Sequence, residues 1–287
     1  MTGPVHGPAP GMPAAGTATP TPPPPAVEAD GLCRFFQDVV AVDRLDLQIP
    51  AGSIFGLLGP NGAGKSTTIK MLTTLLPPSA GTARVAGFDV TRQPAAVRQR
   101  VGYVPQFLSA DGALTGYENL LIFAKLYGIP ARERQQRIME LLELVGLAGA
   151  AHTQVRRYSG GMIRRLEIAQ SLLHRPAVLF LDEPTVGLDP TARRGVWEQV
   201  RLLRERFGTT VVLTTHYMEE ADELCDQVAI LHRGRVAAVG SPADLKAQVG
   251  PGATLEDVFV HFTGSSLETG GSYRDVARTR RTARRLS

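Results

Sequence analysis

The turn that follows the apolar segment "SIFGLL" (residues 53–58) carries residue types that bind an anion. The spacing G-x-x-x-x-G-K-[S/T] is filled by Gly59, Gly64, Lys65 and Ser66. Glycines let backbone N–H groups point inward, and the start of the following helix adds a partial positive charge. In this pattern the lysine reaches the β- and γ-phosphates of a nucleotide, and the serine hydroxyl binds Mg²⁺. The strand before it and the helix after it favour phosphate binding over a simple chain reversal.

Two adjacent carboxylates end a second apolar segment, "VLFLDEPT" (residues 178–185). Ligands of open α/β sheets bind at the carboxyl ends of the strands, so we expect Asp182 beside the phosphate-binding turn. There Asp182 can hold Mg²⁺ through water. Glu183 can orient or deprotonate the attacking water, because phosphoryl transfer depends mainly on positioning and charge neutralisation. The alternative is that the pair only caps the segment that follows.

A second anion site is predicted at "YSGGM" (residues 158–162), which precedes the helical pattern "IRRLEIAQSLL". Ser159 suits the N-cap of that helix, and Gly160 and Gly161 leave its first N–H groups bare. An ordinary capped helix is the alternative interpretation of these residues.

Two single polar residues stand at the ends of further strands. Gln106 follows "VGYVP" (residues 101–105), and His216 follows "TTVVLTT" (residues 209–215). At these positions an amide and an imidazole would point toward the phosphate-binding turn. Polar residues at strand ends are often only solvated. The prediction that Gln106 and His216 are functional therefore depends on the motifs around them.

The elements that position these residues are short apolar runs that alternate with helical patterns. Fully apolar strands separated by helices predict a parallel sheet that is covered on both faces. Predicted strands span residues 53–58, 101–105, 177–182 and 209–215, with a hairpin over 227–239 around Arg233 and Gly234.

Residues of about 108–175 show helical signals and no strand signal. A capping box at Thr115 and Glu118 opens one helix, and Gly128 and Pro130 close it. A second helix is expected over residues 133–146. We therefore expect a helical subdomain inserted into the α/β domain.

The two ends of the chain differ from the rest. Residues 1–28 are nearly all Pro, Ala, Gly and Thr, which predicts a disordered arm. Residues 264–287 are polar and contain "RTRRTARRLS", which predicts a solvated tail or loose adhesion to anionic lipid headgroups. The folded domain is expected over residues 29–263.

Composition excludes several classes of protein. A net charge of +4 does not argue for nucleic acid as a partner. No apolar run reaches the ~18–20 residues of a membrane span, and no signal segment is recognisable. The two cysteines, Cys33 and Cys225, form no spaced framework, which suits a reducing cytosol.

The ordered motifs together resemble the nucleotide-binding subunits of ATP-binding cassette (ABC) transporters. The resemblance spans residues 30–262 approximately. It implies an α/β fold, with a P-loop NTPase (ABC ATPase) core of mixed sheet flanked by helices and an inserted helical subdomain. The motifs that carry it are "GPNGAGKST", Gln106, "YSGGM", "LFLDEPT", "VGLD" ending in Asp189, and "TTHYMEEAD".

The resemblance also implies roles for single residues. Phe36 would stack on adenine, with Phe35 as the adjacent candidate, and Asp189 would lie at a dimer interface. Gln106 would link the nucleotide to the membrane partner. The expected catalytic residues are Glu183, His216, Gln106 and Lys65, and the expected Mg²⁺ ligands are Ser66, Gln106 and Asp182. The expected ATP contacts are Phe36, Gly59, Pro60, Asn61, Gly62, Ala63, Gly64, Lys65, Ser66, Thr67, Ser159, Gly160, Gly161 and Asp189.

The signature motif departs from the family's usual L-S-G-G-Q at both ends, where Tyr158 and Met162 stand. The methionine resembles a subgroup that contains daunorubicin-resistance ATPases, and so does the late segment "TLEDVFVHFTG" (residues 254–264). This likeness implies export of a hydrophobic drug or antibiotic. An exporter of lipid or polysaccharide precursors is the alternative.

The chain has one phosphate-binding turn and one signature motif, whereas in the family the signature contacts ATP on another domain. The resemblance therefore implies a homodimer around two ATP molecules, docked on separately encoded membrane permease subunits. It would lie at the cytoplasmic face of the membrane, with only indirect membrane contact. A soluble ABC ATPase acting on DNA or ribosomes is the other possibility. The absence of sustained heptads and the single cassette argue against it.

Overall fold

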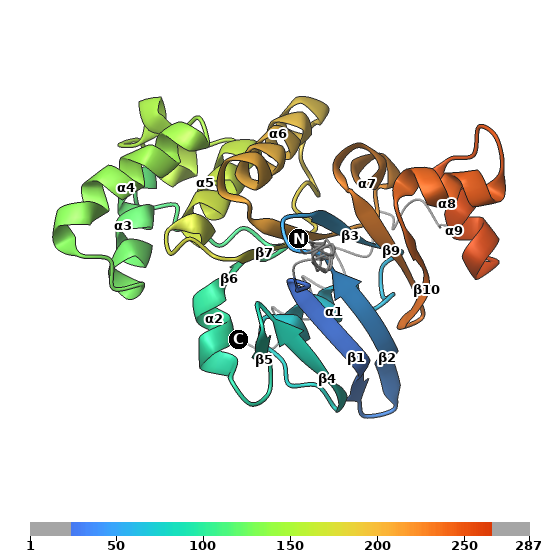
Figure 1. Cartoon of the computed structure of the whole chain (residues 1–287). Helices are drawn as coiled ribbons and strands as arrows, with labels where there is room; N and C mark the ends of the chain where they lie inside the picture. The colour runs from blue at the N-terminus through green and yellow to red at the C-terminus, as the bar shows by residue number, and fades with distance from the viewer. Residues whose placement is uncertain (1–23, 266–287) are drawn as a thin grey trace, which may run out of the picture.

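A computed structural model of the chain describes residues 24–265 (Figure 1). Most of the expected tail and most of the expected N-terminal arm lie outside these residues. Strand β1 begins at Val27, so the last two residues assigned to the arm belong to a sheet. Within the described residues, no helix combines the length and the apolar character that a membrane span requires.

The larger sheet of the described chain has six strands in the order β10-β9-β3-β8-β7-β6. All its neighbours are parallel except β9 and β10, which form the expected antiparallel hairpin. The mixed α/β sheet predicted from the sequence is thereby confirmed. Its strands are β3 (Ile54–Leu58), β6 (Val101–Val104), β7 (Val178–Asp182), β8 (Thr210–Thr215), β9 (Gln227–His232) and β10 (Arg235–Gly240).

Both faces of the central strands β3, β7 and β8 are buried, which explains why β3 and β7 are apolar except for the final Asp182, while the polar residues of β8 are all threonines. Ile54 and Leu58 of β3 point into one apolar cluster, and Phe55 and Leu57 point into the other. The first cluster contains residues of α5 (Gly160–Leu172), α6 (Pro190–Phe207), α7 (Met218–Leu224) and α9 (Leu255–Thr263). The second contains residues of α1 (Lys65–Leu72), α2 (Pro94–Arg100) and the smaller sheet.

The smaller sheet is antiparallel, with the order β2-β1-β4-β5, and the sequence analysis did not predict it. Figure 1 shows it on the side of the molecule where α1 lies, opposite α5 and α6. It packs against the larger sheet through α1, because Ile69 and Leu72 share its apolar cluster. Its strands are β1 (Val27–Phe36), β2 (Val39–Ile49), β4 (Ala80–Val85) and β5 (Phe88–Asp89).

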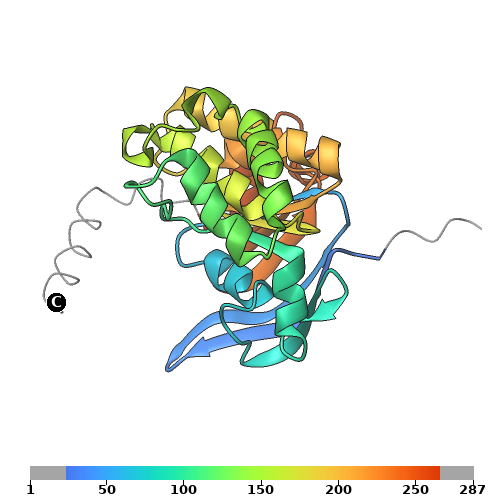
Figure 2. The same cartoon turned by 90° about the vertical axis from the view of Figure 1, so that its left-hand side faces the viewer.

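Residues 105–177, all of which are described, contain helices and no strand between β6 and β7. The first of these helices begins with the capping box at Thr115 and Glu118. Figures 1 and 2 show this helical segment as a layer away from the smaller sheet. Its elements are α3 (Gly116–Leu126), α4 (Ala131–Leu144), the 3-10 helices η1 (Ala148–Ala150) and η2 (Val155–Arg157), and α5. Helix α8 (Pro242–Val249) lies beside α9.

Candidate nucleotide-binding and hydrolysis site

The glycine turn between β3 and α1 is packed so closely that side chains are excluded from two of its positions. A Cβ on Gly59 would lie 2.3 Å from the carbonyl oxygen of Leu231, and one on Gly64 would lie 2.6 Å from that of Ala41. Gly64 also has a left-handed backbone, with φ of 102°. Because the first N–H groups of α1 have no carbonyl partner within the helix, they are available to an anion. The turn therefore fits a phosphate group.

Lys65 is buried at this turn, with only 4% of the residue exposed. Its Nζ donates hydrogen bonds to the carbonyl oxygens of Gly59 at 2.7 Å and Pro60 at 3.1 Å. The same nitrogen lies 3.3 Å from Oε1 of Glu183. Burial lowers the pKa of Lys65, and the Glu183 carboxylate opposes that effect. A cation is thus placed between the turn and a carboxylate.

Ser66 and Asp182 bring hard oxygen atoms together at the start of α1. The Ser66 hydroxyl donates to Oδ1 of Asp182 at 2.8 Å. The Thr214 hydroxyl donates to the same oxygen at 2.7 Å, because Asp182 and Thr214 are paired across β7 and β8. No cluster of three His, Cys, Asp or Glu side chains among the described residues could form a metal cage. Mg²⁺ usually binds to one or two protein oxygen atoms, and phosphate and water oxygens complete its coordination. The oxygens of Ser66 and Asp182 fit this mode of binding.

Glu183 is the residue on which the predicted catalytic groups converge. Its Oε2 accepts a hydrogen bond from Nε2 of Gln106 at 3.0 Å. Its Oε1 faces Lys65 and also lies 3.4 Å from Nδ1 of His216. The ends of β6, β7 and β8 and the start of α1 each contribute one of these residues. The structure thus brings Lys65, Gln106, Glu183 and His216 together.

The backbone at Glu183 is unusual for a residue with a side chain. Its φ is 47°, and its N–H donates to the Thr214 hydroxyl at 2.8 Å, which holds the backbone of Glu183 on β8. Burial raises the pKa of Glu183, but His216 and Lys65 lower it more, so the net shift is downward. The side chain is therefore ionised at neutral pH, the form that can accept a proton.

His216 approaches Glu183 at a distance that is long for a hydrogen bond. Nδ1 is buried and has no aligned partner among the described residues, so the contact acts through charge and dipole. The centre of the ring lies 4.2 Å from that of Tyr217 with the two planes tilted by 40°, and the Arg193 guanidinium lies 4.5 Å over Tyr217. An unpartnered ring nitrogen beside Glu183 fits a site that binds one more polar group.

The signature residues lie at the start of α5. Ser159 is the N-cap of this helix, and its Oγ accepts a hydrogen bond from the N–H of Met162 at 3.3 Å. Ser159 and Gly160 are exposed, whereas a Cβ on Gly161 would lie 2.8 Å from Cβ of Ala192 in α6. No hydrogen bond or ion pair in residues 24–265 joins these residues to the Glu183 cluster.

Asp189, Tyr158 and the two phenylalanines complete the set of sequence-predicted positions. Asp189 caps α6, because its Oδ1 accepts hydrogen bonds from two N–H groups of the first turn. The Tyr158 hydroxyl donates to the Ala150 carbonyl at 2.7 Å, so the tyrosine at the start of the signature is held inside the helical segment. Phe35 and Phe36 are 43% and 42% exposed at the end of β1. The Arg34 guanidinium covers one face of Phe36 at 4.6 Å.

Sequence reasoning missed several residues that support the site. The Thr214 hydroxyl donates to the Asp182 carboxylate and accepts from the backbone N–H of Glu183, and only its place in "VVLTT" could have suggested it. Glu220 in α7 is fully buried, and its Oε1 accepts hydrogen bonds from the Thr185 hydroxyl at 2.8 Å and from the Trp197 indole N–H at 2.9 Å. These contacts join α6 and α7 to the segment that follows Glu183.

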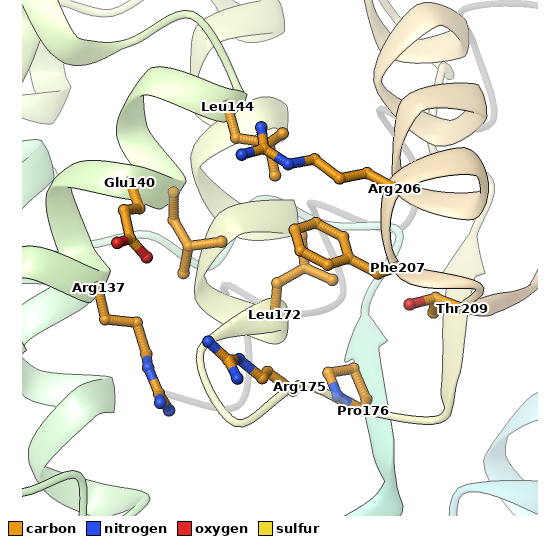
Figure 3. A pocket seen from close by; sticks show the side chains of 10 residues that line it. Arg137, Glu140, Leu144, Leu172, Arg175, Pro176, Arg206, Phe207 and Thr209 are labelled. Carbon is orange, nitrogen blue, oxygen red and sulfur yellow. The ribbon is translucent and has the colours of Figure 1, made fainter.

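A cavity of the described chain lies elsewhere. It has a volume of about 200 Å³ and opens between α4, the turn after α5 and the end of α6 (Figure 3). Its lining includes Leu172, Arg175 and Phe207, and none of the residues predicted to act on a nucleotide. The convergence of polar side chains, and not the depth of a cavity, therefore locates the candidate site.

A glycine turn between a strand and a helix, with its buried lysine beside a strand-end Asp–Glu pair, defines the P-loop class of nucleoside triphosphatases. Comparison with known proteins gives the family. The chain belongs to the ABC transporter family, whose model matches residues 42–186. It is an ATP-binding subunit of that family and an ATPase.

Two relatives and one solved structure illustrate the likeness. The chain is 50% identical to the daunorubicin/doxorubicin resistance ATP-binding protein DrrA of Streptomyces peucetius over 230 residues, which cover 80% of this chain and 69% of that protein. It is 40% identical to the linearmycin resistance ATP-binding protein LnrL of Bacillus subtilis (strain 168), covering 84% and 76%. A solved ATP-binding subunit of an ABC transporter is 30% identical, with a TM-score of 0.73, covering 83% of this chain and 99% of that one.

Proposed function

We propose that two copies of this chain enclose two ATP molecules, each with Mg²⁺, and use hydrolysis to drive export through a separately encoded membrane permease. The observation that carries the hydrolytic part is the convergence of Lys65, Gln106 and His216 on the Glu183 carboxylate. An ionised carboxylate held in this way can take a proton from water as the water attacks the terminal phosphate.

The chain's own residues suit the other parts of the reaction. Lys65 would give up its contacts with Gly59 and Pro60 to bind the β- and γ-phosphates. Ser66, Asp182 and the Gln106 amide oxygen would hold Mg²⁺, which neutralises charge on the phosphate oxygens when it is bound. One of the two exposed rings, with Phe36 as the first candidate, would stack on adenine.

The separation of the signature motif from the Glu183 cluster supports a dimer. Ser159 and Gly160 are exposed at the start of α5, where N–H groups can meet an anion, and within residues 24–265 no hydrogen bond or ion pair joins them to Lys65. A second copy facing the first would place them over the ATP of its partner. Asp189, which caps α6 beside Gly161, would then lie at the interface.

An exposed apolar surface supports docking on a membrane partner. Phe107 and Leu108, directly after Gln106, are 81% and 49% exposed. Asn119 of α3 fixes the following part of this loop, because its side chain pairs with both the N–H and the carbonyl of Asp111. Leu126 of α3 is 75% exposed as well. We assign the surface formed by Phe107 and Leu108 to the permease, which would keep the protein at the cytoplasmic face of the membrane.

The proposed cargo is a hydrophobic, antibiotic-like compound. The names of two relatives refer to daunorubicin/doxorubicin resistance and to linearmycin resistance. Met162 and the segment of α9, whose Leu255, Val258 and Phe259 are buried, support the same subgroup. Inverted vesicles that contain the permease should take up daunorubicin only when ATP and this chain are both present.

Changing Glu183→Gln tests the proposal directly. The variant keeps the shape of the site but cannot accept a proton, so we expect it to bind Mg-ATP, form a dimer in gel filtration and show no turnover. The exposed Glu205→Gln variant is the control and should hydrolyse ATP like the parent. A Glu183→Gln protein that stays monomeric with saturating Mg-ATP would contradict the dimer, and one that turns over normally would contradict the assigned base.

A further inference from the structure

Helix α5 contains a buried ion pair that the nucleotide site does not use directly. Nη1 of Arg164 lies 3.1 Å from Oε2 of Glu167, and the two side chains are 3% and 2% exposed. Burial lowers the pKa of Arg164, and the Glu167 carboxylate opposes that effect. A buried pair of this kind is seldom more stabilising than apolar residues of the same volume, so its contacts need an explanation.

Those contacts hold the loop that contains Gln106. Arg164 donates from Nη1 to the carbonyl oxygen of Pro105 and from Nη2 to that of Gln106, both at 2.7 Å. One planar guanidinium thus binds two neighbouring carbonyl oxygens, and a lysine cannot reproduce this geometry. Arg164 thereby fixes the first end of the loop on α5.

Glu167 fixes the other end of the same loop. Its Oε1 accepts hydrogen bonds from the N–H and the hydroxyl of Ser109 and from the N–H of Ala110 at 3.3 Å. Phe107 and Leu108, the most exposed part of the loop, stand between the two anchored ends. We call Arg164 and Glu167 the loop clamp.

The same helix begins with the signature residue Ser159, five residues before Arg164. On the proposed function, Ser159 acts on the ATP of the partner copy, while Gln106 contacts Glu183 of its own chain at 3.0 Å. Helix α5 therefore carries Ser159 for the ATP of the partner copy, and through Arg164 it holds the loop that places Gln106 at the site of its own chain.

We propose that Arg164 and Glu167 are positioning residues, which couple the signature residue Ser159 to Gln106. This inference rests on the proposed function and deepens it. When α5 moves as the signature closes on the partner's ATP, the loop clamp carries Gln106 and the exposed Phe107 and Leu108 with it. Arg164 and Glu167 thereby link the permease contact to Glu183 of the same chain. Through Ser159 they also link both to the ATP bound by the partner copy.

A variant that removes the loop clamp without leaving a lone buried charge tests the coupling. Arg164→Met and Glu167→Met together should lower kcat roughly 2- to 30-fold, the range of energetic coupling along packed networks, with little change in the KM for ATP. The control is Arg165→Met, since Arg165 donates to the Val145 carbonyl at 2.9 Å within the helical segment and not to the loop. Arg164→Gln with Glu167→Gln, which also leaves no lone charge, is the second variant if the change to methionine does not fold.

A double-mutant cycle with Gln106→Ala separates positioning from a merely structural role. If the loop clamp acts through Gln106, adding the two clamp substitutions to the Gln106→Ala variant should give the same kcat as Gln106→Ala alone. Equal fold-losses in both backgrounds would overturn the inference, because the ion pair would then act elsewhere.

Hydrogen exchange of the segment 105–110 gives a readout that needs no turnover. The N–H groups of Ser109 and Ala110 should exchange faster in the clamp variant than in the parent and in Arg165→Met. Equal exchange in all three proteins would overturn the inference even if ATPase activity is normal. The parent protein could instead lack ATPase activity while the clamp variant still exchanges faster at Ser109 and Ala110. That result would contradict the proposed function but would support the role of the loop clamp in holding the loop.

Discussion

The carboxylate of Glu183 is ionised although it is buried, and its neighbours explain why. Burial alone would raise its pKa, but His216 and Lys65 stabilise the charged form more strongly. Glu183 is therefore kept as a base by groups that are themselves predicted to contact phosphate. The rate of ATP hydrolysis and its loss at low pH should consequently depend on the same side chains, Glu183, His216 and Lys65.

Removing the imidazole should change the pH dependence of turnover. His216 lowers the pKa of Glu183, so His216→Ala should raise that pKa. Because the ionised carboxylate is the active form, turnover is lost as the pH falls through this pKa, and the acidic limb should move to higher pH. Profiles of kcat from pH 4.5 to 8 for the parent and the variant check this. An acidic limb that is unchanged, or that moves to lower pH, would contradict the assigned contact.

Thr214 is a small residue with a large predicted effect. Its hydroxyl donates to Asp182 and accepts from the N–H of Glu183. Thr214→Val keeps the shape but removes both bonds, so we expect roughly 10- to 100-fold lower activity or Mg²⁺ affinity, as for other groups that orient metal ligands. Steady-state ATPase assays over a Mg²⁺ titration measure both quantities.

The matched control for that change is Thr73→Val. Thr73 is equally buried, but its hydroxyl donates to the Ile69 carbonyl within α1. It should retain the activity of the parent. Equal losses in the two variants would mean that the hydroxyl at Thr214 has no particular role.

Among the helices, α5 and α8 allow a comparison of two serine N-caps. Ser241 only stabilises α8, whereas Ser159 of α5 is also proposed to bind ATP. Ser159→Ala and Ser241→Ala each remove a side-chain N-cap, which costs about 1 kcal/mol of stability. We expect both variants to show a similar decrease in unfolding free energy. Only Ser159→Ala should also weaken ATP-driven dimerisation, measured by light scattering. Equal dimerisation in both variants would argue against a signature contact with ATP.

The strand ends were the part of the architecture that the sequence predicted best. Strands buried on both faces are predominantly apolar, so a charged, amide or imidazole side chain at or just after the end of each one marks the sheet edge, as at Gln106, Asp182 and His216. The confirmed α/β fold follows from the same pattern. Where these residues act remains a prediction, although the geometry places them together.

The smaller sheet and the buried polar partners could not be predicted in this way. β1 mixes polar and apolar residues and has irregular register against both of its neighbours, so no clear period of two marks it. Glu167 and Glu220 look like ordinary charged residues of helices. Their burial depends on loops and helices that are distant in the chain, and no local pattern contains that information.

On the scale of the whole molecule, the adjacent exposed side chains of Phe107 and Leu108 form the surface that we assign to the permease. Phe107→Ser with Leu108→Ser should abolish co-sedimentation with permease-containing vesicles. Because both side chains are exposed, unfolding free energy should change by no more than about 0.5 kcal/mol. Phe207→Ser, an exposed phenylalanine beside the cavity of Figure 3, is the control and should still sediment with the vesicles. Sedimentation of the double variant would place the permease elsewhere.

The one tryptophan of the sequence, Trp197, shares the Glu220 carboxylate with Thr185, two residues beyond Glu183. An indole that is 6% exposed and bonded to a carboxylate is a fluorophore whose emission responds to small changes in its surroundings. The protein therefore contains its own optical probe next to the hydrolytic centre. Stopped-flow recording of its intrinsic emission can follow a single catalytic cycle in real time, without a dye or an engineered label.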